Sequence, residues 1–385
     1  MWKKISDFIP NAKAVSTIGI VDITSNGIAS IFWFYIASVL APEEYGEISY
    51  IIAIAAIIST ISLPGIQNAL TVYGAKKVKI QSTLYLISLT LGSISSIIVF
   101  IIFSRFELSL LAIGYIIFNL VISDLLGRKL FPTYAKYIIT NKILTVVLGI
   151  GLYYAIGVEG LIIGIALAAF PYFIRILKEF KVTKIDFSLV RPRLRFMITS
   201  YITQLTGNFS GSVDKLIIAP MLGFALLGNY HLGLQFIAIF MIIPSIIYKY
   251  TLPYDASGNP NKKLKRLSLI SSCGIAALGI FVTPYVVPIL FPQYLEVTEM
   301  IQILSISVIP STLNLNYASK FLGQEKNKIV LGGSLVYLPI QIVTIIILGS
   351  MFGGIGIAIA YSISVTSETL FYVVMDQRIK EDNHV

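Results

Sequence analysis

Charged residues are scarce in this 385-residue chain, at 12% of the total, whereas 56% of the residues are hydrophobic. Soluble domains carry about 25% charged residues, and a surface that faces water cannot be built with half that amount. The single cysteine, Cys273, excludes a disulfide framework and a cysteine-rich metal site. With only two histidines, His231 and His384, a histidine-based zinc site is not expected either. The composition therefore indicates a chain whose outer surface faces lipid.

Catalytic patterns are missing as well. The chain has no Ser/His/Asp set, no paired histidines and no phosphate-binding glycine loop, so we expect neither an enzyme nor a bound metal or cofactor. The loops expected on the outer side are a few residues long, which disfavours a membrane-embedded glycosyltransferase or glycan polymerase. The N-terminal residues MWKK are not followed by a short apolar core with a cleavage site, so the first span is expected to act as the insertion signal.

The chain is rich in long apolar stretches. A helix needs roughly 20 mostly apolar residues to cross about 30 Å of hydrocarbon. We therefore predict an all-α, multi-pass membrane protein with about twelve spans. The stretches lie near residues 14–40, 47–72, 81–103, 108–126, 134–156, 158–177, 196–222, 226–248, 268–291, 296–316, 329–350 and 354–375. Tight turns are expected at Gly157, between the fifth and sixth spans, and at Gly353-Gly354, between the last two.

Lysine and arginine gather in alternate loops between these stretches. If the N-terminus lies in the cytoplasm, Arg105 is the only basic residue in the outer loops, which carry glutamates instead. Because basic residues favour the cytoplasmic side of short loops, we predict that both termini lie in the cytoplasm and that the protein spans the cell membrane. The net charge of +10 then follows from topology, and nucleic acid is not an expected partner.

The sequence also contains two related halves. Residues 39–46, VLAPEEYG, match residues 221–228, MLGFALLG, at an offset of 182. A glycine-rich segment begins the last span of each half, at 160–164 and at 353–356. We predict two six-helix bundles, 1–186 and 187–385, that keep the same orientation because six spans is an even number. Parallel repeats of this kind surround a central cavity in known transporters.

Polar side chains inside spans are costly and mark candidate sites. One narrow face of the seventh span carries Ser200, Gln204, Asn208, Gly211 and Lys215, at spacings of three and four residues. Under the offset of 182, Gln204 corresponds to Asp22 and Asn208 to Asn26 on the first span. Both halves are therefore expected to present a polar row to the cavity.

Structural explanations for the same residues stay open. Gln204 and Asn208 are also suited to hydrogen bonds with a neighbouring helix. Lys215 is placed either to reach the outer headgroups or to pair with the adjacent Asp214. Asp22 is too short to reach the headgroups, which favours a functional role. Nearer the cytoplasmic side, Asp124 is expected to pair with Arg128, and Arg175 is expected to extend to anionic headgroups.

Three stretches carry a resemblance to a known family. They are residues 36–46 followed by 73–77, residues 214–223 followed by 227–230, and residues 290–294 followed by 322–328 and 353–360. In order and spacing they resemble the Wzx-like oligosaccharide flippases of the multidrug/oligosaccharidyl-lipid/polysaccharide exporter superfamily, over nearly the whole chain. The resemblance implies two six-helix bundles, alternating access and a polyprenyl-linked oligosaccharide as substrate. It also implies basic cavity groups for the carrier phosphate, a role that falls on Lys215, with Asp22 and Asn26 beside it.

Two functions follow from this resemblance. In a flippase, Asn26, Gln204 and Asn208 would replace water around sugar hydroxyls, and Asp22 or Asp214 would bind a coupling proton or Na⁺. The alternative is a multidrug/cation antiporter of the same superfamily, in which an acidic residue binds the drug or the ion. The chain departs from the family in its short length, in Pro292 where relatives often have glycine, and in its single cavity lysine. We expect it to act as a monomer.

Overall fold

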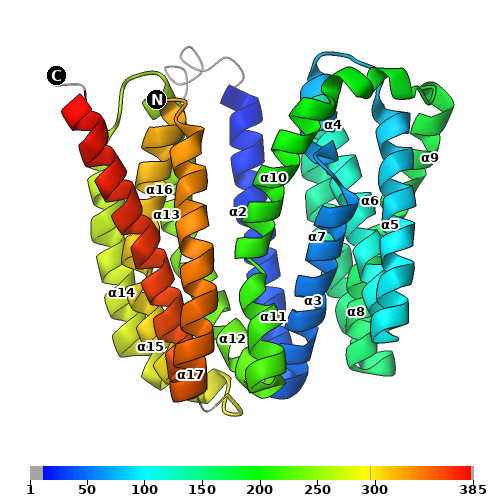
Figure 1. Cartoon of the computed structure of the whole chain (residues 1–385). Helices are drawn as coiled ribbons and strands as arrows, with labels where there is room; N and C mark the ends of the chain where they lie inside the picture. Colours follow the sequence, from blue (N-terminus) through cyan, green and yellow to red (C-terminus); the bar gives the residue numbers. More distant parts are fainter. Residues whose placement is uncertain (1–11, 295, 383–385) are drawn as a thin grey trace. The chain divides into compact units, whose positions relative to one another are not determined.

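Long apolar runs fold as helices in a membrane because a helix satisfies its backbone N–H and C=O groups within its own segment. The computed structural model describes residues 12–294 and 296–382, and every regular element in these ranges is a helix (Figure 1). The helices are α2 (Ala12–Val39), α3 (Pro42–Ser62), α4 (Ile66–Ala75), α5 (Gln81–Phe103), α6 (Phe106–Gly127), α7 (Phe131–Ile156), α8 (Val158–Leu167), η1 (Phe170–Tyr172), α9 (Phe173–Val182), η2 (Phe187–Leu189), η3 (Arg191–Arg193), α10 (Leu194–Ser210), α11 (Val213–Leu222), α12 (Phe224–Phe240), α13 (Ile242–Ala256), α14 (Lys262–Leu290), α15 (Val297–Ile306), α16 (Val308–Gly323) and α17 (Asn327–Asp382).

The predicted spans correspond to single helices or to helices with a break. Within the described residues, eight helices are long and apolar enough to cross a membrane, and the pair α12 and α13, bent by 48°, is a ninth candidate. Two features explain why this number is lower than the predicted twelve. The helix α17 covers both of the last two stretches, and the seventh and tenth stretches are the broken pairs α10–α11 and α15–α16. The predicted turns are present, because Gly157 and Gly353 both have positive φ, at 77° and 58°.

Backbone contacts group the described residues into two compact units. Unit 1 comprises residues up to 29 together with 51–212, and unit 2 comprises residues 30–50 together with 213–385. These units differ from the predicted halves at residues 30–50 and 187–212, which group with the other half's helices. Grouping by contacts does not test where a sequence repeat begins and ends. The division of the repeat into 1–186 and 187–385 therefore remains a proposal.

Unit 1 is centred on α4, α5 and α6, whose buried faces meet through Leu70, Leu84, Leu120 and Leu125. A break between α3 and α4 sets the direction of α4, and Gly65 in this break has a φ of 66°. A Cβ atom at Gly65 would lie 2.0 Å from the carbonyl oxygen of Met197 in α10, so the approach of α10 requires glycine. The helices α4 and α10 therefore pack together.

Unit 2 has its own core, in which α11, α12, α15 and α17 pack through Ile218, Leu227, Leu304 and Ile357. The start of α3 belongs to this unit. It crosses α12 at two glycines, Gly46 and Gly228, where the two backbones are close enough to exclude any side chain. This core includes Ile218 and Ala219 of α11, whose first turn carries Asp214 and Lys215.

Charge is distributed unevenly along each unit. In unit 1, the lysine- and arginine-rich segments between α4 and α5, between α6 and α7 and after α9 lie at one end (Figure 1). The turn between α5 and α6, which contains Arg105, lies at the opposite end. In unit 2, the basic segments between α13 and α14 and between α16 and α17 share one end (Figure 1). Each unit thus has the separation of charge that the positive-inside rule predicts, while the side of the membrane stays a prediction.

Candidate functional site

The polar face of α10 is hydrogen-bonded to its neighbours within unit 1. The side-chain amide of Gln204 donates to Oε1 of Gln67 in α4 at 3.2 Å. The amide of Asn208 donates to Oγ1 of Thr60 in α3 at 2.7 Å, and that hydroxyl in turn donates to the carbonyl of Ala56 at 2.9 Å. The expected hydrogen bonds to a neighbouring helix are therefore present. Each amide still has other donor and acceptor atoms, because it uses one N–H in these contacts.

The degree of exposure of this row bears on its chemistry. Gln204 and Gln67 are half-buried, and Asn208 is exposed. The row therefore presents uncharged amide and hydroxyl groups at a surface of unit 1 rather than inside its core. Such groups exchange hydrogen bonds with sugar hydroxyls without a large change in energy, since both partners are neutral.

The predicted residues of the first span lie on α2, also in unit 1. Asp22 is half-buried and Asn26 is exposed, and the spacing of four places them on one helix face. Asp22 lies close enough to Tyr134 in α7 for the two side chains to interact electrostatically. Its role as an ion-coupling group remains a prediction.

Asp214 and Lys215 form an ion pair at the start of α11 in unit 2. The Lys215 ammonium lies 3.2 Å from Oδ1 of Asp214, and the Lys215 backbone N–H donates to the same oxygen at 2.8 Å. The hydroxyl of Tyr230 donates to Oδ2 at 2.9 Å. The side chains of Lys215 and Asp214 are only 12% and 4% exposed. The pairing that the sequence left open is therefore formed, and any phosphate at Lys215 would compete with Asp214.

A second polar group in unit 2 was not predicted from the sequence. The ring of His231 in α12 lies 5.1 Å from that of Tyr45 in α3 and 6.1 Å from that of Trp33 in α2. The Nε2 atom of His231 is 3.3 Å from the amide nitrogen of Gln235. Within the described residues, Nδ1 of His231 and the hydroxyl of Tyr45 are both buried without a hydrogen-bond partner. The sequence repeat could have indicated this contact. Gly46 and Gly228 are equivalent positions in the two repeats, and Tyr45 directly precedes the first while His231 follows the second.

Tyr294, in the loop before α15, packs against Tyr45 of this group. Its hydroxyl donates to the carbonyl of Leu40 at 3.1 Å. Burial, and then the charge of Glu44, raise the pKa of Tyr294, so the hydroxyl keeps the proton that this hydrogen bond needs. The Gln293 amide donates to the same carbonyl at 2.5 Å, which fixes the turn between α2 and α3.

Four charges alternate at the basic end of unit 1. The buried Asp124 of α6 accepts from Nε of Arg128 at 2.7 Å and from Nη2 of Arg175 at 3.0 Å. Nη2 of Arg128 also lies 2.6 Å from Oε1 of Glu179 in α9. The predicted pair of Asp124 and Arg128 is therefore present, whereas Arg175, expected to extend to headgroups, binds Asp124. These pairs connect α6 to α9.

Solved structures share this fold. No protein-family model matches the chain, and no curated protein matches it. The chain aligns with the inward-facing conformation of a multidrug resistance MATE family transporter of the MOP superfamily, over 93% of this chain and 95% of that one, with a TM-score of 0.70 and 16% identity. It aligns with the lipid II flippase MurJ, in an inward closed conformation, over 93% and 87%, with a TM-score of 0.75 and 16% identity. A MOP superfamily transporter from Pyrococcus furiosus matches over 96% of both chains, with a TM-score of 0.60 and 14% identity.

These alignments confirm the predicted fold class. The chain is a multi-pass helical membrane protein with the fold seen in MATE transporters and in MurJ. At 14–16% identity the likeness concerns the fold alone, so it does not distinguish a flippase from a drug transporter. The choice between these functions depends on the side chains described above.

Proposed function

We propose that this protein is a membrane transporter that flips a polyprenyl-linked oligosaccharide across the cell membrane by alternating access. In this proposal the chain acts as a monomer with both termini in the cytoplasm. A polar path would be exposed first to the cytoplasmic face and then to the outer face, while the prenyl tail stays in lipid. The fold shared with MurJ and the MATE transporters supports transport as the general activity.

The observation that carries the proposal is the neutral row on α10. Gln204 with Gln67, and Asn208 with Thr60, form two side-chain hydrogen bonds one helical turn apart. A glycan needs closely spaced neutral donors and acceptors, because each sugar ring carries several hydroxyl groups. A cationic drug needs a carboxylate and apolar surface instead, and these four side chains offer neither. We assign Asn26, which is exposed on α2, to the same role.

The carrier phosphate would be bound by Lys215. In the structure this ammonium is held by Asp214, and Asp214 also accepts from Tyr230. A proton or Na⁺ at Asp214 would weaken the pair and free Lys215 for the phosphate. Ion binding and substrate binding would then favour each other, as linkage between two sites requires. Asp22 is the second proposed ion-coupling residue.

The alternative is a multidrug/cation antiporter. Asp22 favours it, because this carboxylate is half-buried on the face of α2 that also carries Asn26. In that case Asp22 would bind the cation directly, and the amides of α10 would have a structural role only.

Proteoliposomes that contain the purified protein would decide between the two. A fluorescent polyprenyl-diphosphate oligosaccharide is added to both leaflets, and a membrane-impermeant quencher then reports movement between leaflets. The flippase proposal expects loss of protected fluorescence over time with the wild-type protein, and uptake of a cationic dye at the rate of empty vesicles. Dye transport driven by a proton or Na⁺ gradient, without glycan movement, would support the antiporter and reject the flippase.

A further inference from the structure

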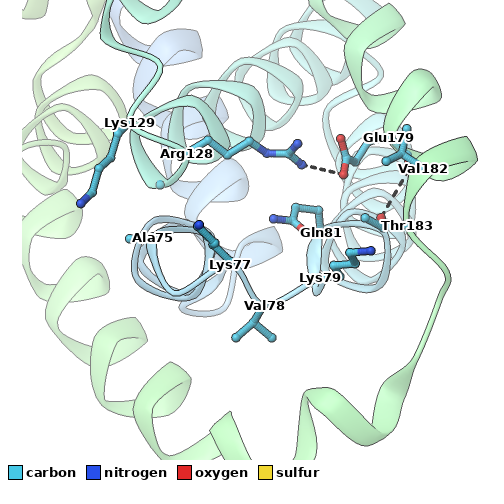
Figure 2. A pocket seen from close by; sticks show the side chains of 12 residues that line it. Ala75, Lys77, Val78, Lys79, Gln81, Arg128, Lys129, Glu179, Val182 and Thr183 are labelled. Carbon is cyan, nitrogen blue, oxygen red and sulfur yellow. Dashed lines mark hydrogen bonds and ion pairs between the residues drawn. The ribbon is translucent and has the colours of Figure 1, made fainter.

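A cavity of about 370 Å³ lies at the basic end of unit 1, where α4 and α6 end and α5 begins (Figure 2). Its lining contains four cationic side chains and one carboxylate, which are Lys77, Lys79, Arg128, Lys129 and Glu179. The carboxylate of Glu179 is already neutralised, because it lies 2.6 Å from Arg128. Within the described residues, none of the three lysines forms an ion pair. The cavity therefore has an excess of positive charge.

The backbone holds two of these lysines in an uncommon conformation. Lys77 and Lys129 have φ of 58° and 59°, in the left-handed region, at the ends of α4 and α6. In both cases the lysine N–H donates to a carbonyl three residues back, at 3.0 Å, as in helix ends that usually have glycine at this position. A residue other than glycine is uncommon there, because its Cβ atom crowds the following carbonyl oxygen. Two lysines in the same strained position line one cavity.

The ends of α4 and α6 are fixed next to each other. A Cβ atom on Gly127 would lie 2.4 Å from the carbonyl oxygen of Leu70, and one on Gly74 would lie 3.3 Å from Cα of Gly127. The helices therefore touch through backbone, and the spacing of Lys77 and Lys129 is set by the fold.

Gln81 supplies an unsatisfied polar group in the same cavity. It is the first residue of α5, is only 5% exposed, and its Oε1 has no hydrogen-bond partner within the described residues. Figure 2 shows Gln81 and Lys77 in the middle of the lining, with Lys79 and Lys129 on opposite sides. The next residue, Ser82, is held by Thr183 of α9, with the two hydroxyls 2.5 Å apart. A ligand with both acceptor oxygens and a hydroxyl donor would satisfy the Gln81 amide, at the helix end that favours negative charge.

We propose that this cavity binds the phosphate headgroup of an anionic lipid, independently of what the protein transports. Phosphate oxygens match the lysines and the N-terminus of α5, and a headgroup hydroxyl matches the acceptor of Gln81. The neighbouring chain favours a lipid over a free phosphate, because Val182, Ile185 and Phe187 are 70%, 48% and 58% exposed. Val182 lines the cavity, Ile185 and Phe187 follow it in the chain after α9, and all three suit contact with acyl chains.

The test uses the purified full-length protein in a neutral detergent, with binding measured by native mass spectrometry. The probes are short-chain phosphatidylglycerol, short-chain phosphatidylcholine and inorganic phosphate. We expect phosphatidylglycerol to bind most tightly, and the double variant Lys77→Gln with Lys129→Gln to weaken it about tenfold or more. The matched control is Lys262→Gln with Lys263→Gln, which removes the same charge from exposed lysines of unit 2 and should leave binding unchanged.

Three results would overturn the proposal. Equal weakening by the control pair would show that net charge alone attracts the lipid. Inorganic phosphate that binds as tightly as phosphatidylglycerol would assign the cavity to a free phosphate. A third variant, Gln81→Met, keeps the charge and avoids dependence on how the lysine variants fold. It should raise the melting temperature of the lipid-free protein, because it removes an unsatisfied amide, and weaken binding of phosphatidylglycerol. Unchanged lipid binding by Gln81→Met would also reject the site.

Discussion

Gly46 of α3 and Gly228 of α12 lie against each other, and they occupy equivalent positions in the two sequence repeats. A Cβ atom on Gly46 would lie 1.9 Å from the carbonyl oxygen of Phe224 and 2.8 Å from the amide nitrogen of Gly228. A Cβ atom on Gly228 would lie 1.8 Å from the carbonyl oxygen of Pro42. The repeat that is visible in the sequence as an offset of 182 thus brings corresponding residues into contact within unit 2.

Replacement of Gly228 by alanine should destabilise the protein strongly. The new methyl group meets backbone, which cannot rotate away, so the cost should reach or exceed the roughly 1–3 kcal/mol typical of overpacking. The measurement is the melting temperature of the detergent-purified variant. Gly274→Ala is the matched control, because Gly274 lies in α14 with open space around it and alanine favours a helix. Similar melting temperatures for the two variants would contradict the close crossing.

Lys215→Ala should lower the amount of folded protein in the membrane. It leaves the buried Asp214 carboxylate without its cation, and loss of one partner of a buried pair costs about 3–5 kcal/mol. The double variant Asp214→Ala with Lys215→Ala removes both charges and should recover most of the protein level, as measured by immunoblot of isolated membranes.

The same variants test the phosphate role. If Lys215 binds the carrier phosphate, the double variant should be present at a normal level but inactive in glycan flipping, and Lys215→Arg should retain part of the activity. Full activity of the double variant would remove Lys215 and Asp214 from the mechanism.

The neutral row on α10 should affect transport more than folding. Asn208→Ala removes an exposed amide that donates one hydrogen bond to Thr60, so stability should change by only about 1 kcal/mol. If Asn208 binds sugar hydroxyls, the rate of glycan movement at low substrate concentration should fall about tenfold. Thr206→Ala is the control, because its hydroxyl, among the residues that the structure describes, bonds only to the carbonyl of Ile202 on its own helix, at 2.9 Å. Equal rates for both variants would remove Asn208 from the path.

The membrane orientation is tested by labelling of single cysteines in a Cys273→Ser background. Glu44, Glu159 and Glu296, each replaced by cysteine, should react with an impermeant maleimide from outside intact cells. Cysteines at Lys77, Arg193 and Lys263 should react only after the membrane is made permeable. Labelling of the second group in intact cells would reverse the predicted orientation.

Much of the helical architecture follows from residues that act locally. Apolar length determines the spans, and glycine determines the turns at Gly157 and Gly353, since both positions need a positive φ. The break at Gly65 was not predicted, because it depends on the approach of Met197 from a distant helix. The left-handed backbone conformation of Lys77 and Lys129 was not predicted either, since glycine is the usual sequence signal for this position at a helix end.

The candidate site was only partly predictable for the same reason. The spacing of Gln204 and Asn208 shows a shared face, but only tertiary packing identifies Gln67 and Thr60 as their partners. Asp214 and Lys215 are adjacent in sequence, yet both pairing and reaching to headgroups were open until Tyr230 and the buried environment were seen. His231 and Tyr45 come together through the crossing of α3 and α12, which periodicity within one helix does not reveal.

The alternating charges of Arg175, Asp124, Arg128 and Glu179 constrain how this protein can change during evolution. If Arg128 and Glu179 are both lost, the remaining Asp124 and Arg175 still neutralise each other. If only one of the four residues is lost, its former partner is left as an uncompensated charge. Among natural relatives of this chain, these positions should therefore change in oppositely charged pairs. A lineage that has lost Asp124 should also have lost one of the two arginines, or have gained an acidic residue beside them.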